Sequence, residues 1–142
     1  MKQKRIPRPL RRRVSQQSGF QCGYGLTPQR ISGARMVIDH IIPEAAGGLT
    51  SEENLWLACH SCNEFKGAQT HARDPQTGRR VRLFNPRKHR WRDHFTWSED
   101  GTRVVGLTPC GRAIVVALQL NHEEIVAARR QWVSVGWWPP EG

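Results

Sequence analysis

The distribution of apolar positions in the middle of the chain predicts two short strands followed by a helix. Residues 36–42 form a β-branched run that stops at Pro43, and residues 55–58 form a second apolar run. The segment between them contains Gly47-Gly48, which favours an irregular loop. Residues 61–72 have the spacing of apolar positions that fits a helix. The expected order is therefore strand, loop, strand, helix.

The last third of the chain predicts a hairpin, a strand and a final helix. Residues 95–97 and 103–107 are strand-like, and a Glu-Asp-Gly turn lies between them. Residues 113–120 follow as an almost continuous apolar run, which we interpret as a strand. Asn121 with a glutamate three residues later forms a capping box, which predicts a helix that continues to Gly136.

The size and hydropathy of the chain are those of one soluble domain. Its 142 residues are enough to bury one modest core. The longest apolar run, residues 113–118, is far shorter than the ~20 residues that a membrane-spanning helix needs. The basic N-terminus is not followed by an apolar targeting segment. We therefore expect a cytoplasmic protein without a membrane partner; the oligomeric state is not indicated.

The net charge of +10 is concentrated in two runs of basic residues. Residues 1–13 contain no acid, and Pro7 and Pro9 predict an extended arm there. Residues 79–92 also contain no acid. Arginine forks match phosphate oxygens, so both runs predict contacts with a nucleic acid, although basic runs also occur as plain solvated surface. The candidate phosphate contacts are Arg11, Arg12, Arg13, Arg79, Arg80, Arg82, Arg87, Lys88, Arg90 and Arg92.

Four side chains of the central segment have the chemistry of a metal-dependent hydrolase. The carboxylate of Asp39 and the amide oxygen of Asn63 are hard ligands suited to Mg²⁺ or Mn²⁺. His40 has an imidazole able to take a proton from water near neutral pH, and Asn54 opens the second strand. Each of these residues also has a purely structural interpretation, as a strand-end, hydrogen-bonded or capping side chain.

The order of these motifs resembles that of HNH endonucleases. The resemblance rests on Val-Ile-Asp-His-Ile-Ile-Pro from residue 37, Gly-Gly from residue 47, Asn-Leu from residue 54 and Cys-His-Ser-Cys-Asn-Glu-Phe-Lys from residue 59. The family implies an α+β fold with a ββα-metal core, in which a hairpin and one helix hold a single divalent cation.

The resemblance also implies a role for each candidate residue. Asp39 and Asn63 would bind Mg²⁺ or Mn²⁺, and His40 would be the general base. Asn54 would brace the loop behind the histidine, and Lys66 would reach a phosphate. The implied reaction is hydrolysis of phosphodiester bonds in DNA, with RNA as the other substrate class, in which the metal stabilises charge on the scissile phosphate and 5′-phosphate ends result.

The cysteines predict a zinc site that lacks one ligand. Many HNH proteins bind a structural zinc through two Cys-x-x-Cys pairs, and Cys59 with Cys62 has the spacing of one pair. The other pair would comprise Cys22 and residue 25, which is Gly25. Three thiolates with water, a histidine or a displaced ligand would bind Zn²⁺ more weakly. Alternatively, the three cysteines pack as small buried side chains without a metal.

The resemblance divides the chain into three parts. Residues 1–19 form a basic arm, residues 20–72 the HNH core, and residues 73–142 a basic segment with an α+β extension. The first hypothesis is a metal-dependent HNH endonuclease that cleaves DNA. The second is a nucleic-acid-binding module whose nuclease centre is inactive and whose two basic runs provide the function.

Overall fold

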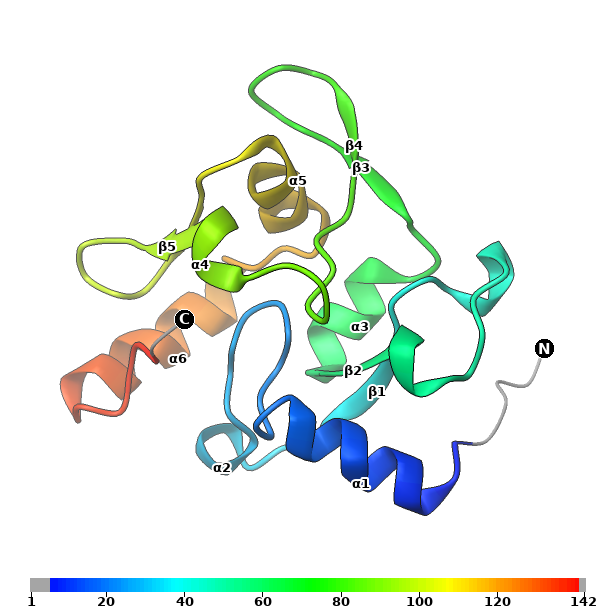
Figure 1. Ribbon diagram of the computed structural model, residues 1–142. Coiled ribbons are helices and arrows are strands. Elements are labelled where there is room, and N and C mark those ends of the chain that lie inside the picture. The colour runs from blue at the N-terminus through cyan, green and yellow to red at the C-terminus, as the bar shows by residue number, and fades with distance from the viewer. Residues whose placement is uncertain (1–5, 141–142) are drawn as a thin grey trace.

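The computed structural model describes residues 6–140 as short helices around three two-stranded antiparallel sheets (Figure 1). This architecture confirms the expected α+β class, and none of the helices in this range is long and apolar enough to cross a bilayer. The helices are α1 (Arg8–Gln17), α2 (Gln29–Ser32), η1 (Glu44–Ala46), η2 (Glu52–Asn54), α3 (His60–Lys66), α4 (Trp91–His94), α5 (Pro109–Ala117) and α6 (Glu123–Ser134). The strands are β1 (Val37–His40), β2 (Leu55–Ala58), β3 (His71–Arg73), β4 (Arg80–Arg82), β5 (Phe95–Trp97) and β6 (Val104–Gly106).

A ββα unit forms the centre of the N-terminal half. β1 pairs antiparallel with β2 along the whole of both strands, and α3 follows directly. Both strands fall within the predicted apolar runs, so the order strand, loop, strand, helix is confirmed. The helix is shorter than expected because Gly67, with a φ of 52°, ends it after Lys66. The end of the predicted helix is instead strand β3.

The N-terminal arginines lie on a helix, so the prediction of an extended arm is wrong for the described residues. α1 begins directly after Pro7, and Pro9 lies in its first turn, where the missing N–H costs no helical hydrogen bond. The buried side chain of Val14 belongs to the hydrophobic core, and α1 contacts β1 and β2. Residues 1–5 of the predicted arm lie outside the described residues.

The predicted hairpin of the C-terminal part is confirmed, whereas the strand predicted after it is a helix. β5 pairs antiparallel with β6. The apolar residues 113–117 belong to α5, which begins at Pro109. Thr108 caps this helix, because its hydroxyl accepts a hydrogen bond from the N–H of Gly111 at 3.0 Å. A short apolar run fits a buried helix as well as a buried strand, and here the N-cap at Thr108 favours the helix.

The final helix is confirmed, but its cap lies one residue after the predicted one. The N-cap of α6 is His122, whose Nδ1 accepts a hydrogen bond from the N–H of Ile125 at 3.2 Å. Asn121 binds β6 instead. Its side chain accepts a hydrogen bond from the N–H of Val104 at 2.8 Å and donates one to the C=O of Val104 at 2.9 Å. Asn121 therefore fastens the start of α6 to the hairpin.

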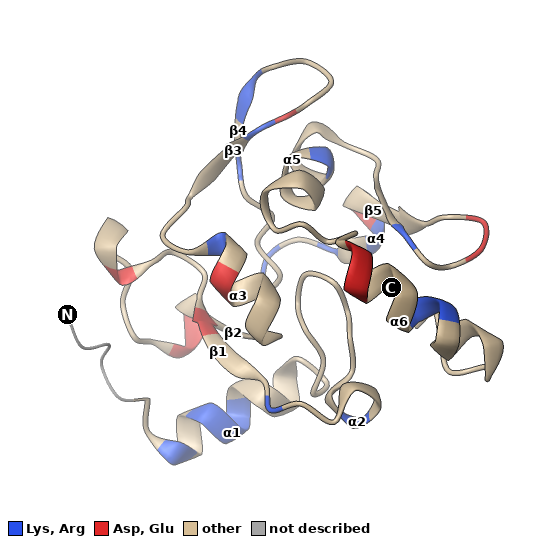
Figure 2. Ribbon diagram, turned by 180° about the vertical axis from the view of Figure 1, so that it is seen from behind, with Lys and Arg blue, Asp and Glu red and all other residues tan. Residues whose placement is uncertain are grey.

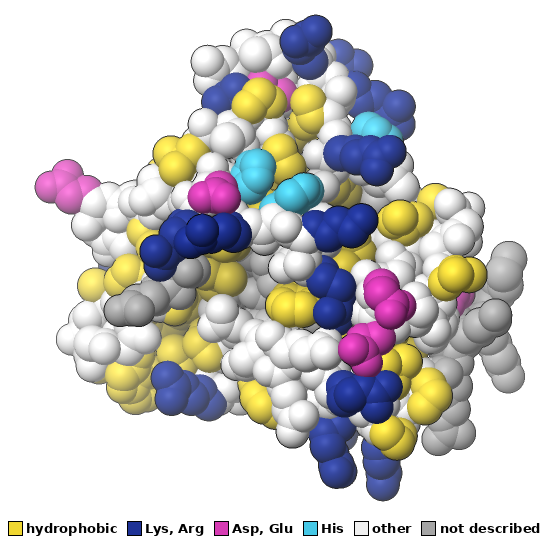
Figure 3. Space-filling view, viewed as in Figure 1, with side chains coloured by type: hydrophobic (Ala, Val, Ile, Leu, Met, Phe, Trp, Pro, Cys, Tyr) yellow, Lys and Arg dark blue, Asp and Glu magenta, His cyan; other side chains and the backbone are white. Residues whose placement is uncertain are grey.

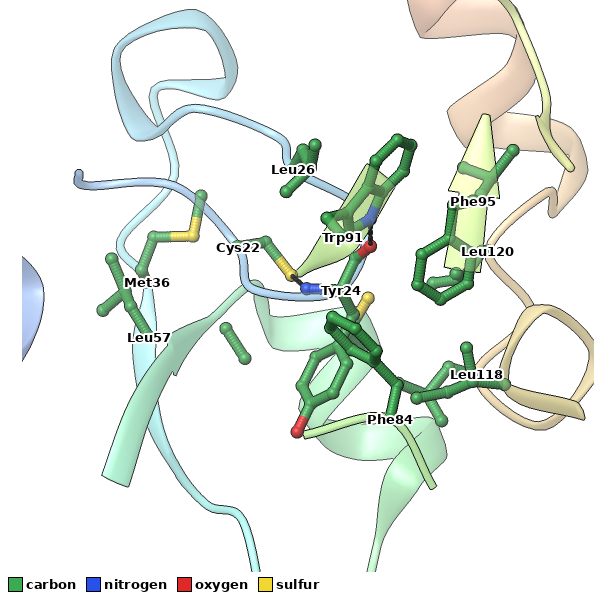
Figure 4. Close-up of a cluster of buried hydrophobic side chains, with 14 of the residues drawn as sticks. Cys22, Tyr24, Leu26, Met36, Leu57, Phe84, Trp91, Phe95, Leu118 and Leu120 are labelled. Carbon is green, nitrogen blue, oxygen red and sulfur yellow. Dashed lines mark hydrogen bonds between the residues drawn. The ribbon is translucent and has the colours of Figure 1, made fainter. Parts of the chain in front are cut away.

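One hydrophobic core joins the ββα unit to residues 73–140, which we call the C-terminal extension. Figure 4 shows this cluster, which contains Leu57 of β2 together with Phe95 of β5. The indole Nε1 of Trp91 donates a hydrogen bond to the backbone oxygen of Tyr24 at 2.9 Å, so a buried polar bond also crosses between the two parts. The extension thus packs on the ββα unit through shared core side chains.

Four tryptophans form a continuous row within the extension. The ring centroids are 5.1 Å apart for Trp91 and Trp97, 4.8 Å apart for Trp97 and Trp138, and 5.3 Å apart for Trp138 and Trp132. Tilted and edge-to-face ring pairs of this kind add to the stabilisation from buried area. The row therefore connects α4, β5, α6 and the segment after α6.

An ion pair fixes the hairpin of β3 and β4 to α5. The guanidinium of Arg112 donates to the two carboxylate oxygens of Asp74 at 2.9 and 3.0 Å, and the hydroxyl of Thr77 donates to Asp74 at 2.7 Å. These bonds hold the pKa of Asp74 well below its ordinary value. A carboxyl group whose pKa is lower in the folded than in the unfolded state stabilises the fold above its ordinary pKa, and this contribution disappears as the pH falls.

Arg112→Met is expected to lower the melting temperature at neutral pH. The difference from the wild type should narrow as the pH falls below about 4, the ordinary pKa of an aspartate, because Asp74 then takes up a proton in the unfolded chain, whereas the ion pair of the folded wild type opposes that protonation. Thermal unfolding followed by circular dichroism across this pH range measures the effect. Arg103→Met, which alters an exposed arginine of the extension, is the control. A difference that does not change with pH would contradict this account.

Candidate active site

The carboxylate of Asp39 lies near the end of β1 in a buried ion pair, and the residue is 4% exposed. Its Oδ1 accepts a hydrogen bond from Nζ of Lys66 at 3.1 Å, and its Oδ2 accepts one from the hydroxyl of Tyr24 at 2.6 Å. Burial raises the pKa of Asp39, whereas the ammonium of Lys66 and the hydroxyl of Tyr24 lower it. Two side chains from separate segments therefore hold this carboxylate in place.

Lys66 is inside the protein, which corrects the expectation of a phosphate contact from the helix surface. The residue is 1% exposed, and its Nζ also donates to the backbone oxygen of His40 at 2.8 Å. The physical reason is the carboxylate of Asp39, which is the ionic partner of the ammonium. Lys66 follows Asn63 by three residues on α3, so both side chains lie on the same helix face.

Tyr24 is a site residue that the sequence did not reveal. It lies in the turn after Cys22, 15 positions before Asp39, and only the fold brings its hydroxyl to the carboxylate. Its hydroxyl donates to Asp39, and its backbone oxygen accepts the hydrogen bond from Trp91. Tyr24 thus links the carboxylate of the site to the C-terminal extension.

The imidazole of His40 is held by the loop that follows β1. The residue is 7% exposed, and its Nε2 lies 3.0 Å from Oγ1 of Thr50 and 3.2 Å from Oε1 of Glu44. The hydroxyl of Thr50 donates to the same carboxylate oxygen at 3.2 Å. An ionised carboxylate only accepts hydrogen bonds, so this arrangement favours the tautomer of His40 with its proton on Nε2. Nδ1 is then the basic nitrogen.

Asn54 closes the loop between β1 and β2. Its Oδ1 accepts a hydrogen bond from the N–H of Ile42 at 2.8 Å, and its Nδ2 donates to the backbone oxygens of Ile42 and Leu49, both at 2.9 Å. Gly48 lies directly beside these groups, because a Cβ there would lie 1.7 Å from the oxygen of Ile42. The loop that holds the imidazole therefore has a fixed path.

Asn63 lies in α3 and is half-buried. Its side-chain amide makes no hydrogen bond with any residue between 6 and 140, so its oxygen is available to a ligand. Asp39 and Asn63 supply one carboxylate and one amide oxygen, which are donors that Mg²⁺ and Mn²⁺ prefer. Mg²⁺ sites commonly combine one or two carboxylates with water and substrate phosphate oxygens, so the donor set fits a divalent cation.

Three cysteines meet beside the first turn of α3. The sulfur atoms of Cys22, Cys59 and Cys62 lie within 4.8 Å of one another, and we call them the cysteine cluster. Cys59 is the N-cap of α3, and its Sγ accepts a hydrogen bond from the N–H of Cys62 at 3.4 Å. Hydrogen bonds from the thiols of Cys22 and Cys62 lower the pKa of Cys59, and burial raises the pKa of Cys22 to about 12. The cluster offers three ligands to a zinc ion, and Gly25 offers none.

The arginines of the first basic run differ in their surroundings. Figure 2 shows the Lys and Arg residues of α1 and of the β3–β4 hairpin on either side of the ββα unit. On α1, Arg12 is exposed. Arg11 donates to the backbone oxygen of Met36 at 2.8 Å, and Arg13 pairs with Glu52 at 2.7 Å. Two of the three predicted phosphate contacts on α1 therefore already bind the protein itself.

The second basic run is mostly at the surface. Arg87 is the half-buried member: it donates to the backbone oxygen of Leu55 at 3.0 Å and lies 4.9 Å from the ring centroid of Trp56. Figure 3 shows Lys and Arg side chains on one face of the molecule, from the β3–β4 hairpin to α1. The exposed members of this run are Arg79, Arg80, Arg82, Lys88, Arg90 and Arg92.

The sequence of this region matches that of a nuclease family. A family model described as HNH endonuclease matches residues 22–69, which include the cysteine cluster, both strands and α3. The resemblance to HNH endonucleases drawn from the motifs of this segment is therefore confirmed.

A much longer curated protein contains a segment that is similar to this region. Over 53 residues the chain is 43% identical to the CRISPR-associated endonuclease Cas9 of Corynebacterium diphtheriae. These 53 residues are 37% of this chain and 5% of that protein. The matched segment is thus a small part of the length of the relative. No solved structure matches the chain.

Proposed function

We propose that this protein is a metal-dependent endonuclease that hydrolyses phosphodiester bonds of DNA. The observation that carries the proposal is the contact between α3 and the end of β1: Lys66 of α3 donates hydrogen bonds to Asp39 and to the backbone oxygen of His40, and the same helix carries Asn63. Carboxylate, amide and imidazole groups in one place can hold a divalent cation and activate water. The family of residues 22–69 supports a nuclease-type function in general.

His40 is the general base in this proposal. Its Nδ1 takes a proton from a water molecule, and the oxygen of that water attacks the phosphorus in line with the leaving 3′ oxygen. Glu44 and Thr50 hold Nε2, so the imidazole keeps the orientation and tautomer that leave Nδ1 basic. The products are a 5′-phosphate and a 3′-hydroxyl end.

Asp39 and Asn63 hold the divalent cation, Mg²⁺ or Mn²⁺, in this proposal. The bound cation supplies positive charge to the scissile phosphate and to the leaving oxygen. Lys66 and Tyr24 orient the carboxylate of Asp39 from two directions. Because Lys66 donates to Oδ1, the carboxylate is held on β1 before any cation binds.

The exposed arginines are the proposed contacts to the phosphates of the substrate. Arg12 and the exposed residues of the second basic run provide charge on both sides of the site. Contacts with a phosphate backbone release counterions, so binding should weaken steeply as salt is added. These contacts carry no base-edge recognition, so we propose little sequence preference.

A nucleic-acid-binding protein with an inactive centre is the second candidate. One observation favours it: both carboxylate oxygens of Asp39 have a protein partner, and Lys66 provides a positive charge at Oδ1. If Lys66 keeps this place when the chain meets Mg²⁺, its positive charge opposes the binding of the cation at Oδ1, and the arginine surface alone would remain functional.

Supercoiled plasmid is the substrate that separates the two candidates. We expect the purified protein to nick or linearise it with Mg²⁺ or Mn²⁺, and to stop when EDTA removes the metal, because the proposal assigns stabilisation of the leaving oxygen to the cation. Gel electrophoresis of the plasmid measures cleavage, and a mobility shift in EDTA measures binding. Binding without cleavage under every metal condition would support the second candidate, and an RNA of matched length compares the substrate classes.

Glu44→Gln is expected to lower kcat for plasmid cleavage by about 10- to 100-fold with little change in KM, as for other groups that orient a functional histidine. Glutamine can donate as well as accept, so it no longer fixes the proton on Nε2 of His40. Glu44 is a positioning residue, and initial rates at several DNA concentrations provide the kcat and KM values. Glu53→Gln, at an exposed residue before β2, is the control. Equal rates for both variants would contradict the role of Glu44.

A further inference from the structure

The cysteine cluster does not fit a closed structural zinc site. Structural zinc ions in proteins take four ligands in a tetrahedron. Cys22, Cys59 and Cys62 supply three sulfur atoms. The fourth position of the family pattern is Gly25, which has no side chain to bind a metal.

The space in front of Gly25 is filled by the guanidinium of Arg129. A Cβ built on Gly25 would lie 3.7 Å from Nη2 of Arg129, which is ordinary van der Waals contact. Arg129 is on α6, 104 positions further along the chain, and it is 1% exposed. Gly25, Cys59, Cys62 and Arg129 line the same cavity between the ββα unit and α6.

Several groups of the extension fix the guanidinium of Arg129 there. Nη1 donates to the backbone oxygen of Thr102 at 3.0 Å, and Nη2 donates to the backbone oxygen of Leu120 at 2.8 Å. The guanidinium carbon lies 5.5 and 5.8 Å from the ring centroids of Trp97 and Trp138. All of these contacts are with residues of the extension, and they hold the side chain in place.

Arg129 is a buried cation without a carboxylate partner among residues 6–140. A buried charge is costly unless its surroundings compensate for it. Burial lowers the pKa of Arg129 to about 10, so the side chain is charged at neutral pH. The backbone oxygens that accept its hydrogen bonds and the two indole rings beside it provide the compensation.

We infer that Arg129 closes the cysteine cluster in place of a fourth zinc ligand, so that the C-terminal extension fixes the turn at residues 22–27. This turn is held at its base, because the N–H of Cys22 donates to the oxygen of Thr27 and the N–H of Leu26 donates to the oxygen of Cys22, both at 3.0 Å. Its tip, at Gly25, faces Arg129, because a Cβ built on Gly25 would lie 3.7 Å from Nη2 of Arg129. The inference concerns how this part folds and does not depend on nuclease activity.

Arg129→Met tests the inference in the full-length protein. Methionine keeps much of the apolar stem but removes the guanidinium. We expect the amides of residues 22–27 to exchange with deuterium about tenfold faster in the variant, because local opening of the turn becomes easier. The control is Arg130→Met, which removes an exposed arginine from the next position of α6 and should leave this exchange unchanged. Hydrogen exchange followed by mass spectrometry makes both measurements.

Metal dependence provides the second measurement. We expect EDTA to leave the melting temperature of the wild type unchanged and zinc analysis to find far less than one ion per chain. A full zinc ion per chain with a large loss of melting temperature in EDTA would overturn the inference. The inference would also be overturned if the amides of residues 22–27 exchanged at the wild-type rate in Arg129→Met, since Arg129 would then stabilise only the extension.

Arg129→Lys keeps the test decisive if the methionine variant does not fold. Lysine retains the charge but cannot form the same fork of hydrogen bonds. We expect faster exchange at residues 22–27 than in the wild type, together with the unchanged response to EDTA. Wild-type exchange at these amides in Arg129→Lys would overturn the role of the guanidinium.

Discussion

His40→Ala is expected to lower plasmid cleavage by about 10²- to 10⁴-fold, which is the usual contribution of a general base. The reason is that His40 alone takes the proton from the attacking water in the proposed mechanism. DNA binding in EDTA should stay close to that of the wild type, because the exposed arginines of both basic runs are unchanged. Cleavage rates under excess enzyme and mobility shifts give the two quantities.

The matched control for this prediction is His60→Ala. His60 begins α3 and its side chain is 76% exposed, whereas the side chain of His40 is 6% exposed. We expect His60→Ala to cleave at the wild-type rate. Full activity in His40→Ala, with a melting temperature close to that of the wild type, would show that His40 is not the general base.

Asp39→Asn should have the second large effect, because it replaces the charged metal ligand with a neutral amide and removes half of a buried ion pair. Metal-dependent cleavage should be lost, and the free energy of unfolding should fall by about 3 kcal/mol, since Lys66 then remains as a buried cation without its counterion. Denaturant unfolding and plasmid cleavage measure the two effects. Loss of cleavage alone, with full stability, would mean that the ion pair contributes little to the fold.

The double variant Asp39→Asn, Lys66→Met separates stability from catalysis. Removing both charges eliminates the unpaired ammonium, so the double variant should be more stable than Asp39→Asn and still inactive. Recovery of stability without activity is what a ligand role for Asp39 requires. A double variant that cleaves DNA with Mg²⁺ would contradict the assignment of the metal site.

The ββα unit was accessible from the sequence because its signals are local. The apolar runs of β1 and β2 and the breaks after them follow from residues close in the chain, and the spacing of Asp39, Asn54 and Asn63 is a motif that can be compared with a family. The pattern of cysteines in the same family likewise predicted that Cys22 lies beside Cys59 and Cys62, as the structure shows. About a third of the chain, and the candidate metal and base residues within it, could therefore be predicted.

The remainder depends on contacts between distant segments. The apolar run at residues 113–117 fits a strand as well as a helix, and α1 starts within a proline-containing segment that looked extended. Lys66 would be a surface lysine on an isolated helix, and it is buried here because its ammonium binds the carboxylate of Asp39 and the backbone oxygen of His40. Tyr24 binds Asp39, which lies 15 positions later in the chain, and Arg129 lies beside Gly25, which is 104 positions earlier. The pattern of residues along the chain does not predict such distant pairs.

Four of the six tryptophans of this protein form the row in the C-terminal extension, so its intrinsic fluorescence is weighted toward that region. Trp91, Trp97, Trp132 and Trp138 are close enough to exchange excitation energy, and all belong to the C-terminal extension. Emission at a wavelength selective for tryptophan will therefore be weighted toward the docking of the extension, whereas Tyr24 reports from beside Asp39 through its own absorption. The two signals, recorded on one sample, can distinguish loosening of the extension from damage to the carboxylate and imidazole pair.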